Sequence, residues 1–193
     1  MQEHVDSYLA RLSAAVDALP RDRLELLGEM LFRAYENEKQ VFTLGNGGSA
    51  STASHMAADL AKNTIGPNMR RFRILSLNDN TSIMTALAND MGYENVFCEQ
   101  LVNLITAGDL LVVISASGNS ENVLKAMSYA QERSAQVVGL LGFDGGRAAA
   151  LADLSIIVPS DHYGVIEDAH LIVNHIFVDY FRTRLAQDRA WVV

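Results

Sequence analysis

The chain has 193 residues, of which 49% are hydrophobic and 20% charged, a composition typical of one globular domain rather than a disordered protein. Its formal net charge is −8, so it lacks the basic surface that binds DNA or RNA, and we expect no direct contact with nucleic acid. No apolar run approaches the roughly 20 residues that span a bilayer, and no signal peptide begins the chain. We therefore expect a cytoplasmic protein without a membrane segment, and the single cysteine, Cys98, agrees with a reducing compartment.

The first forty residues show two helical patterns, Val5–Leu19 and Asp22–Glu36, separated by Pro20. Neither helix has a strand of its own to cover. Helices placed before an α/β unit often pack against a neighbouring subunit, so this pair, residues 1–38, predicts an oligomer contact. Packing on the chain's own domain is the equal alternative.

From residue 40 onward, short apolar strands alternate with helical patterns. The predicted strands are Gln40–Leu44, Phe72–Leu77, Asp109–Ser115, Gln136–Gly142 and Leu154–Val158. Five strand–helix units predict a mostly parallel five-stranded sheet covered on both faces, which is a three-layer αβα sandwich with two extra N-terminal helices. No linker or repeat divides the chain, so we expect residues 1–193 to form a single domain.

Two turns that follow predicted strands carry the features of an anion site. Gly45–Ser49 has three residues without a Cβ atom, and Ser49 is placed to cap the next helix; a tight structural turn is the equal alternative. In the second turn, Ser115, Ser117 and Ser120 surround Gly118-Asn119 at the start of a helix. Hydroxyls, free N–H groups and a helix dipole together suit a phosphate, although helix capping alone would also place a serine here. The excess of hydroxyls favours phosphate.

Titratable side chains gather on two predicted helices. His55 and Asp59 are four residues apart, and Glu167 and His175 are eight apart on the final helix, so each pair shares a helix face. These groups can supply an acid and a base or four metal ligands. A histidine on a helix is more often structural, which is the interpretation we give to His4, His162 and His170. His175 lies among apolar residues, which favours a functional role.

The whole chain then resembles a known family. The segments GNGGSASTASHMAADL, ALANDMGYENVF, ISASGNSENVLKAM, GFDGGRAAALADLSIIVPS and VIEDAHLIVNHI resemble, in this order, the sugar isomerase (SIS) family, and specifically its phosphoheptose isomerase branch. The resemblance implies the SIS fold and an aldose–ketose isomerase. It implies that sedoheptulose 7-phosphate is converted to D-glycero-D-manno-heptose 7-phosphate through a cis-enediol. It also implies a homotetramer with active sites between subunits, in a route to heptose for lipopolysaccharide or another glycoconjugate.

Residue by residue, the resemblance implies the following roles. His175 and Asp59 are catalytic; Asn46, Gly47, Ser49, Asn89, Asp90, Ser115, Ser117, Asn119, Ser120 and Glu167 bind substrate or its phosphate; and His55, Asp59, Glu167 and His175 can bind Zn²⁺, with no organic cofactor. Four positions depart from the family pattern: Asp59 replaces a glutamate, Glu167 a glutamine, Ala116 a threonine and Asn63 an arginine. These differences leave open which phosphorylated sugar is the substrate.

A second function remains to be distinguished. One branch of the family has lost the catalytic residues and serves as a tetrameric scaffold that binds the replication initiator protein. The presence of both His55 and His175 with acidic partners favours the enzyme.

Overall fold

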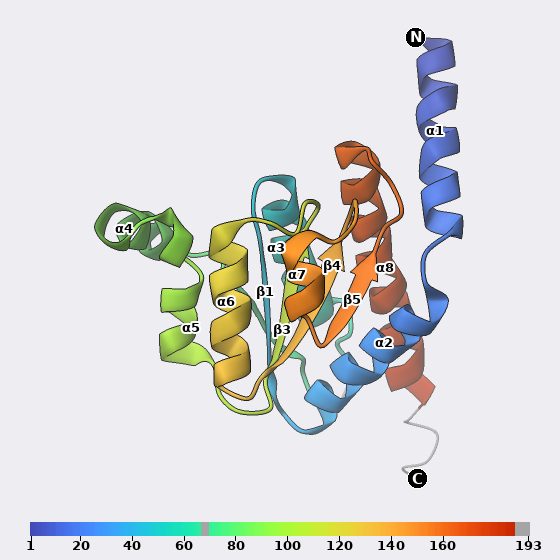
Figure 1. The fold of residues 1–193 in the computed structure, drawn as a ribbon. Coiled ribbons are helices and arrows are strands. Elements are labelled where there is room, and N and C mark those ends of the chain that lie inside the picture. Colours follow the sequence, from blue (N-terminus) through green and yellow to red (C-terminus); the bar gives the residue numbers. More distant parts are fainter. Residues whose placement is uncertain (67–69, 188–193) are drawn as a thin grey trace.

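The computed structural model describes residues 1–66 and 70–187, and these ranges form a three-layer α/β structure (Figure 1). Its strands are β1 (Gln40–Gly45), β2 (Arg73–Ser76), β3 (Leu110–Ser115), β4 (Gln136–Leu141) and β5 (Leu154–Ile157). Its helices are α1 (Gln2–Asp17), α2 (Arg21–Glu36), α3 (Gly48–Lys62), α4 (Thr81–Met91), the 3₁₀ turn η1 (Tyr93–Asn95), α5 (Cys98–Leu104), α6 (Glu121–Glu132), α7 (Gly146–Leu151) and α8 (Tyr163–Gln187). Each predicted strand is present, with ends within one residue of the prediction.

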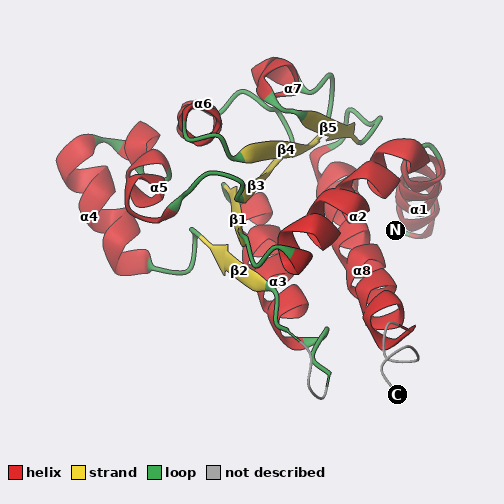
Figure 2. Cartoon of the chain, turned by 90° about the horizontal axis from the view of Figure 1, so that it is seen from below, coloured by secondary structure: helices red, strands yellow, loops and turns green. Residues whose placement is uncertain are grey.

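The sheet is parallel throughout and is covered on both faces. Every residue of the central strand β3 is buried, because its apolar side chains point alternately into two cores. One core lies between the sheet and α2, α3 and α8, and the other between the sheet and α5, α6 and α7 (Figure 2). The predicted sandwich is confirmed. None of the helices in the described ranges combines the length and apolar character that a membrane crossing requires.

The strand order β2-β1-β3-β4-β5 places a topological switch between β1 and β3. The chain leaves β1 toward one edge of the sheet and leaves β3 toward the other, and Gly45 at the end of β1 pairs with Ile114 near the end of β3. Ligands of open parallel sheets bind at such switch points, beyond the carboxyl ends of the strands. Both turns singled out in the sequence begin here.

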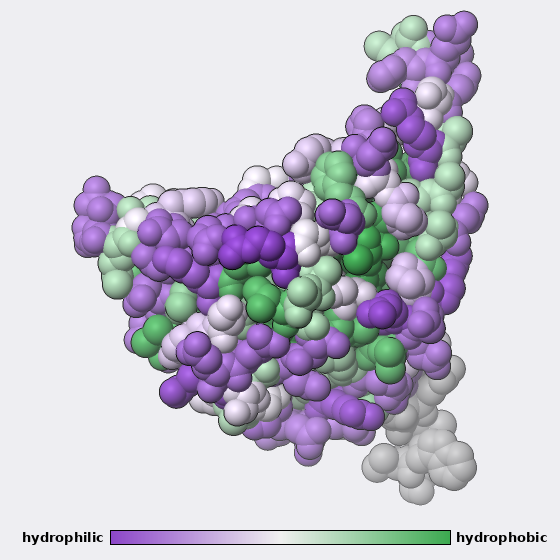
Figure 3. Space-filling model, viewed as in Figure 1, coloured by the Kyte–Doolittle hydropathy of each residue, from purple (hydrophilic) through white to green (hydrophobic). Residues whose placement is uncertain are grey.

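The two N-terminal helices differ in their packing. In α2, Leu27 and Leu31 are completely buried, and the helix packs against β1, β3 and β5. The expectation that neither helix covers a strand is therefore wrong for α2, because the apolar stripe of α2 lies over strands that come later in the chain. By contrast, Ala15 is the one buried residue of α1, and this helix extends beyond the body of the domain with a mostly hydrophilic outer end (Figures 1 and 3).

A polar contact holds α1 against α8. The hydroxyl of Tyr8 donates to Asp168 over 2.7 Å, and this hydrogen bond raises the pKa of Tyr8 to about 12. The hydroxyl therefore keeps its proton at neutral pH, and α1 has a defined direction although it buries little surface.

Candidate active site

Helices α3 and α8 bring three predicted site residues together. Nε2 of His55 lies 3.2 Å from Oδ2 of Asp59, and Nε2 of His175 lies 3.8 Å from the same oxygen. The two imidazole rings meet edge to face with their centroids 5.1 Å apart. One carboxylate oxygen therefore faces two imidazoles that come from different helices, an arrangement suited to proton transfer or to binding a cation.

The three residues of this His–Asp–His cluster (His55, Asp59 and His175) differ in exposure. The side chain of Asp59 is 15% exposed, whereas His55 is 43% and His175 54% exposed. A carboxylate at the base with two accessible imidazoles above it leaves room for a ligand on the open side. The cluster lies on a surface of the single chain rather than in an enclosed cavity.

Two asparagines also contact Asp59. Nδ2 of Asn63 donates to Oδ1 over 2.8 Å, and Nδ2 of Asn174 donates to Oδ2 over 3.3 Å. The sequence marked Asn63 only as a departure from the family pattern, although its spacing of four residues from Asp59 could have indicated the contact. Asn174 gave no signal, since the contact joins residues 115 positions apart.

The geometry of the His–Asp–His cluster fits a zinc ion. Its three ligand atoms all lie within 4.8 Å of one another. In a tetrahedral site with bonds of about 2.0–2.1 Å, ligand atoms are separated by roughly 3.3 Å, close to the distances from Asp59 to the two imidazoles. Imidazole nitrogen and carboxylate oxygen are both ordinary zinc ligands.

Glu167, near the start of α8, lies against the start of α3 and away from the His–Asp–His cluster. A Cβ atom placed on Gly48 would lie 2.5 Å from both carboxylate oxygens of Glu167, so this side chain lies against the first turn of α3. The positive end of the α3 dipole favours a carboxylate there. Within one chain, the structure does not bring Glu167 into the His–Asp–His cluster, so its place as a fourth metal ligand stays a prediction.

The serine-rich turn, residues 115–120, is ordered by its own hydrogen bonds. Oγ of Ser115 accepts from the N–H of Gly118 over 3.1 Å, and Oγ of Ser117 accepts from the N–H of Asn119 over 3.3 Å. Both hydroxyl groups act as acceptors in these bonds, so their protons are available to a phosphate oxygen. Ser120 precedes α6 as predicted, but its side chain makes no capping hydrogen bond.

The glycine-rich turn, residues 45–49, differs from the prediction in one detail. Ser49 does not cap α3, because the helix begins at Gly48 and its N-cap is Gly47. Gly47 has φ +57° and ψ −124°, a conformation that a residue with a Cβ atom adopts only under strain. The backbone is therefore free to approach a ligand, while Ser49 is buried in the first turn of α3.

A pair of asparagines joins the glycine-rich turn to the first turn of α6. The side-chain amides of Asn46 and Asn122 donate to each other, both over 2.9 Å, and the hydroxyl of Tyr93 also donates to Asn46. Asn46 was predicted from the family resemblance, whereas Asn122 and Tyr93 were missed. These contacts hold the start of α3 beside the start of α6, so both helix N-termini can act on one anion.

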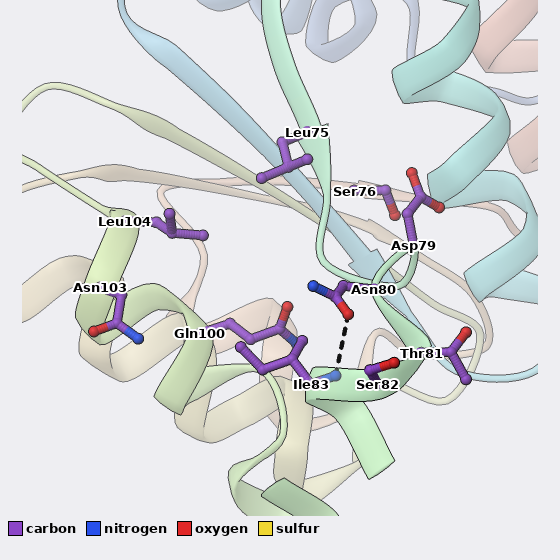
Figure 4. A pocket seen from close by; sticks show the side chains of 10 residues that line it. All are labelled: Leu75, Ser76, Asp79, Asn80, Thr81, Ser82, Ile83, Gln100, Asn103 and Leu104. Atoms are coloured by element: carbon purple, nitrogen blue, oxygen red, sulfur yellow. Dashed lines mark hydrogen bonds between the residues drawn. The ribbon is translucent and has the colours of Figure 1, made fainter. Parts of the chain in front are cut away.

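Asn89 and Asp90 lie apart from these groups. They are exposed near the end of α4 and hydrogen-bond to each other over 2.8 Å. In Figures 1 and 2, α4 lies on the opposite side of the domain from α8, so one chain does not bring this pair to the His–Asp–His cluster. A pocket of about 680 Å³ beside α4, lined by Leu75, Asn80 and Gln100 among others, contains none of the predicted site residues (Figure 4).

His170 has the structural role expected from the sequence. It is almost completely buried, and its Nε2 lies 3.0 Å from the carbonyl oxygen of Leu141. Burial lowers the pKa of His170 to about 4, with the hydrogen bond to Leu141 opposing this shift in part. The ring is therefore neutral at physiological pH.

Comparison with known proteins agrees with this architecture. The SIS domain profile matches residues 4–142. The phosphoheptose isomerase of Sulfurimonas denitrificans is 36% identical over 86% of this chain and 85% of its own, and that of Nitratiruptor sp. is 43% identical over 74% and 76%. The solved structure of phosphoheptose isomerase GmhA from Neisseria gonorrhoeae gives a TM-score of 0.87 at 32% identity, covering 94% of this chain and 98% of that one.

The chain therefore belongs to the SIS domain family. Its curated relatives and its structural neighbours place it with the phosphoheptose isomerases, which confirms the resemblance seen in the sequence. It is an aldose–ketose isomerase, and the scaffold alternative is not favoured.

Proposed function

We propose that this isomerase interconverts sedoheptulose 7-phosphate and D-glycero-D-manno-heptose 7-phosphate through a cis-enediol. The observation that carries the proposal is the meeting of His55, Asp59 and His175 beside the middle and second half of α3, while this helix begins at the glycine-rich turn, which Asn46 joins to the start of α6. Phosphate and reacting carbons would thus bind at opposite ends of one helix segment. The names of the relatives support this substrate.

The length of this segment suits a seven-carbon sugar. From Gly48 to His55 the helix rises by about 10 Å. Seven bonds separate C2 from the phosphorus of an open-chain heptose 7-phosphate, and a zigzag of bonds of about 1.5 Å spans about 9 Å. A sugar two carbons shorter would fall about 2.5 Å short of this span by the same estimate.

The chemistry needs a base that removes the proton next to the carbonyl and an acid that moves a proton between the oxygens. We assign these steps to Asp59 and His175, which face each other at 3.8 Å. The serine-rich turn and the Asn46–Ser49 segment hold the phosphate with neutral donors, so that binding energy orients C1 and C2 at the imidazoles. For Glu167, Asn89 and Asp90 we keep the predicted role of binding sugar hydroxyls.

We propose zinc binding as an alternative use of the same residues, because a nitrogen or oxygen atom that coordinates zinc is not free to transfer a proton. His55, Asp59 and His175 would hold the ion, because their spacing fits tetrahedral coordination and their donors are zinc ligands. A bound zinc ion would polarise the substrate carbonyl and stabilise negative charge on its oxygen. Metal analysis of the purified protein, with Asp59→Asn as control, tests this site separately from turnover: we expect stoichiometric zinc in the parent and little in the variant.

We further propose a homotetramer acting in the cytoplasm. Val5 and Leu9 of α1 are 40% and 55% exposed, and the His–Asp–His cluster is open on one side, so a neighbouring subunit can cover both. The partly buried Cys98 and the homology to isomerases of sugar phosphates suit a reducing compartment. Light scattering tests the assembly, with a mass of about four times 21.1 kDa expected.

The decisive experiment is an isomerisation assay on sedoheptulose 7-phosphate, with and without added Zn²⁺. We expect conversion by the parent chain and about 10³-fold slower conversion by His175→Ala. Fructose 6-phosphate and ribulose 5-phosphate serve as shorter competitors, for which we expect a lower kcat/KM. Absence of turnover of sedoheptulose 7-phosphate in both conditions would contradict the proposal. Faster turnover of a shorter ketose would show that the shorter ketose is the substrate.

A further inference from the structure

A buried amide on α8 contacts the proposed catalytic carboxylate. Asn174 has no exposed surface, and its Nδ2 donates to Oδ2 of Asp59. Its Oδ1 is buried without a hydrogen-bond partner among the described residues. An unpaired buried acceptor costs stability, so an apolar side chain of similar size would suit this position better if packing were its only role.

The orientation of this amide is set by Asp59. His170, one helical turn earlier on the same face of α8, must carry its proton on Nε2 to bond the Leu141 carbonyl, which leaves its buried Nδ1 without a donor as well. Turning the amide over would put Oδ1 of Asn174 against the carboxylate, with two acceptors facing each other. The donor therefore stays on Asp59 although two acceptors on α8 remain unsatisfied.

We propose that Asn174 is a positioning residue for the isomerisation, acting through Asp59. With Asn63 it supplies one amide donor to each carboxylate oxygen, and so fixes the carboxylate plane while Oδ2 faces the imidazoles of the cluster. A short aspartate arm needs this restraint, because a displacement of about 1 Å at a reacting group can cost a hundredfold in rate. The inference rests on the proposed role of Asp59 in proton transfer.

The test compares two buried amides on different helices. Gln100 on α5 is 4% exposed and donates to the carbonyl oxygens of Leu77 and Val96, away from the cluster. We expect Asn174→Leu to keep or raise Tm while kcat falls about tenfold and KM stays within twofold. Gln100→Leu should do the opposite and lower Tm without changing kcat.

Several outcomes decide the matter. A kcat of Asn174→Leu within twofold of the parent would overturn the proposal, as would equal loss of activity and of Tm in both variants. If the leucine variant does not fold, Asn174→Ala gives the same kcat and KM comparison without a larger side chain. Asn174→Leu should also add nothing to the loss of kcat in an Asp59→Asn background, and a full additive loss would contradict action through Asp59.

A second readout separates this inference from the proposed function. If the parent chain shows no turnover of sedoheptulose 7-phosphate, the proposed function fails, and Zn²⁺ titration of the same variants then carries the test. We expect Asn174→Leu to bind Zn²⁺ at least fivefold more weakly than the parent, because the Asp59 ligand is less ordered, and Gln100→Leu to bind as the parent does. Equal affinities in all three proteins, or a parent that binds no Zn²⁺, would overturn the positioning role.

Discussion

The serine-rich turn and the His–Asp–His cluster are built in opposite ways. The turn consists of neutral groups that its own backbone N–H bonds hold in place, whereas the cluster consists of ionisable groups from two helices that meet only in the folded protein. The turn therefore offers neutral donors, which suit a phosphate that must bind and be released. In the proposed mechanism, the cluster places proton-transfer groups where charge develops on the substrate. Changes in the turn should thus alter KM, and changes in the cluster should alter kcat.

The largest expected effect comes from the cluster. His175→Ala removes a proposed acid/base group, which typically contributes a factor of 10²–10⁴, so we expect kcat to fall by about 10³ with KM within threefold. Steady-state kinetics on sedoheptulose 7-phosphate measure both parameters. Residual kcat above a tenth of the parent value would remove His175 from the proton-transfer steps and undo the contrast between the two regions.

The conformation of the serine-rich turn does not tolerate a methyl group at Gly118. Gly118 has φ +62°, and a Cβ atom there would lie 2.0 Å from the carbonyl oxygen of Gly145, so we expect Gly118→Ala to lower the free energy of unfolding by about 3 kcal/mol. Urea denaturation measures this loss. Gly48→Ala is the matched control: the three atoms nearest to its new Cβ all belong to the movable carboxylate of Glu167, so the loss in the free energy of unfolding should stay below about 1 kcal/mol. Equal losses in the free energy of unfolding for the two variants would show that the turn is not rigid.

The free energy of unfolding should depend on pH through His170. Its pKa is about 4 in the folded protein and about 6.5 in the unfolded chain, so the unfolded state binds more protons between these values. The stabilisation is complete above pH 6.5 and is lost as pH falls toward 4; between pH 7.5 and 5 the loss is about 2 kcal/mol. Urea denaturation of the parent and of His170→Leu at both pH values isolates the contribution of His170 to the free energy of unfolding. The difference between the two pH values should shrink by that amount in the variant, and an unchanged difference would contradict the buried neutral imidazole.

The smallest expected effect comes from a hydroxyl group of the serine-rich turn. Ser117→Ala removes one neutral donor to the phosphate, so we expect KM to rise about tenfold, which corresponds to about 1.4 kcal/mol, with kcat within twofold. Inorganic phosphate as a competitive inhibitor should lose the same factor in affinity. A fall in kcat without a change in KM would show that the turn takes part in the chemistry and not only in binding.

Local sequence patterns were sufficient for much of the fold. The alternation of apolar strands with amphipathic helices predicted all five strands, because strand and helix periods are local properties of the chain. The position of α2 was not predictable in this way. Its stripe of Leu24, Leu27 and Leu31 showed that one face is buried, but not that the covering surface is formed by strands up to β5.

For the site, the sequence by itself determined the kinds of chemistry: hydroxyls and glycines at strand ends, and imidazole and carboxylate pairs on helices. Only the tertiary structure decided which of these groups meet. It placed His175 beside Asp59, and it placed Glu167 at the start of α3. It also revealed the amide contacts of Asn174 and Asn122. The physical reason is that contacts between α3, α6 and α8 depend on how whole elements pack on the sheet, and helix periodicity fixes the face of a side chain but not the neighbour that this face will meet.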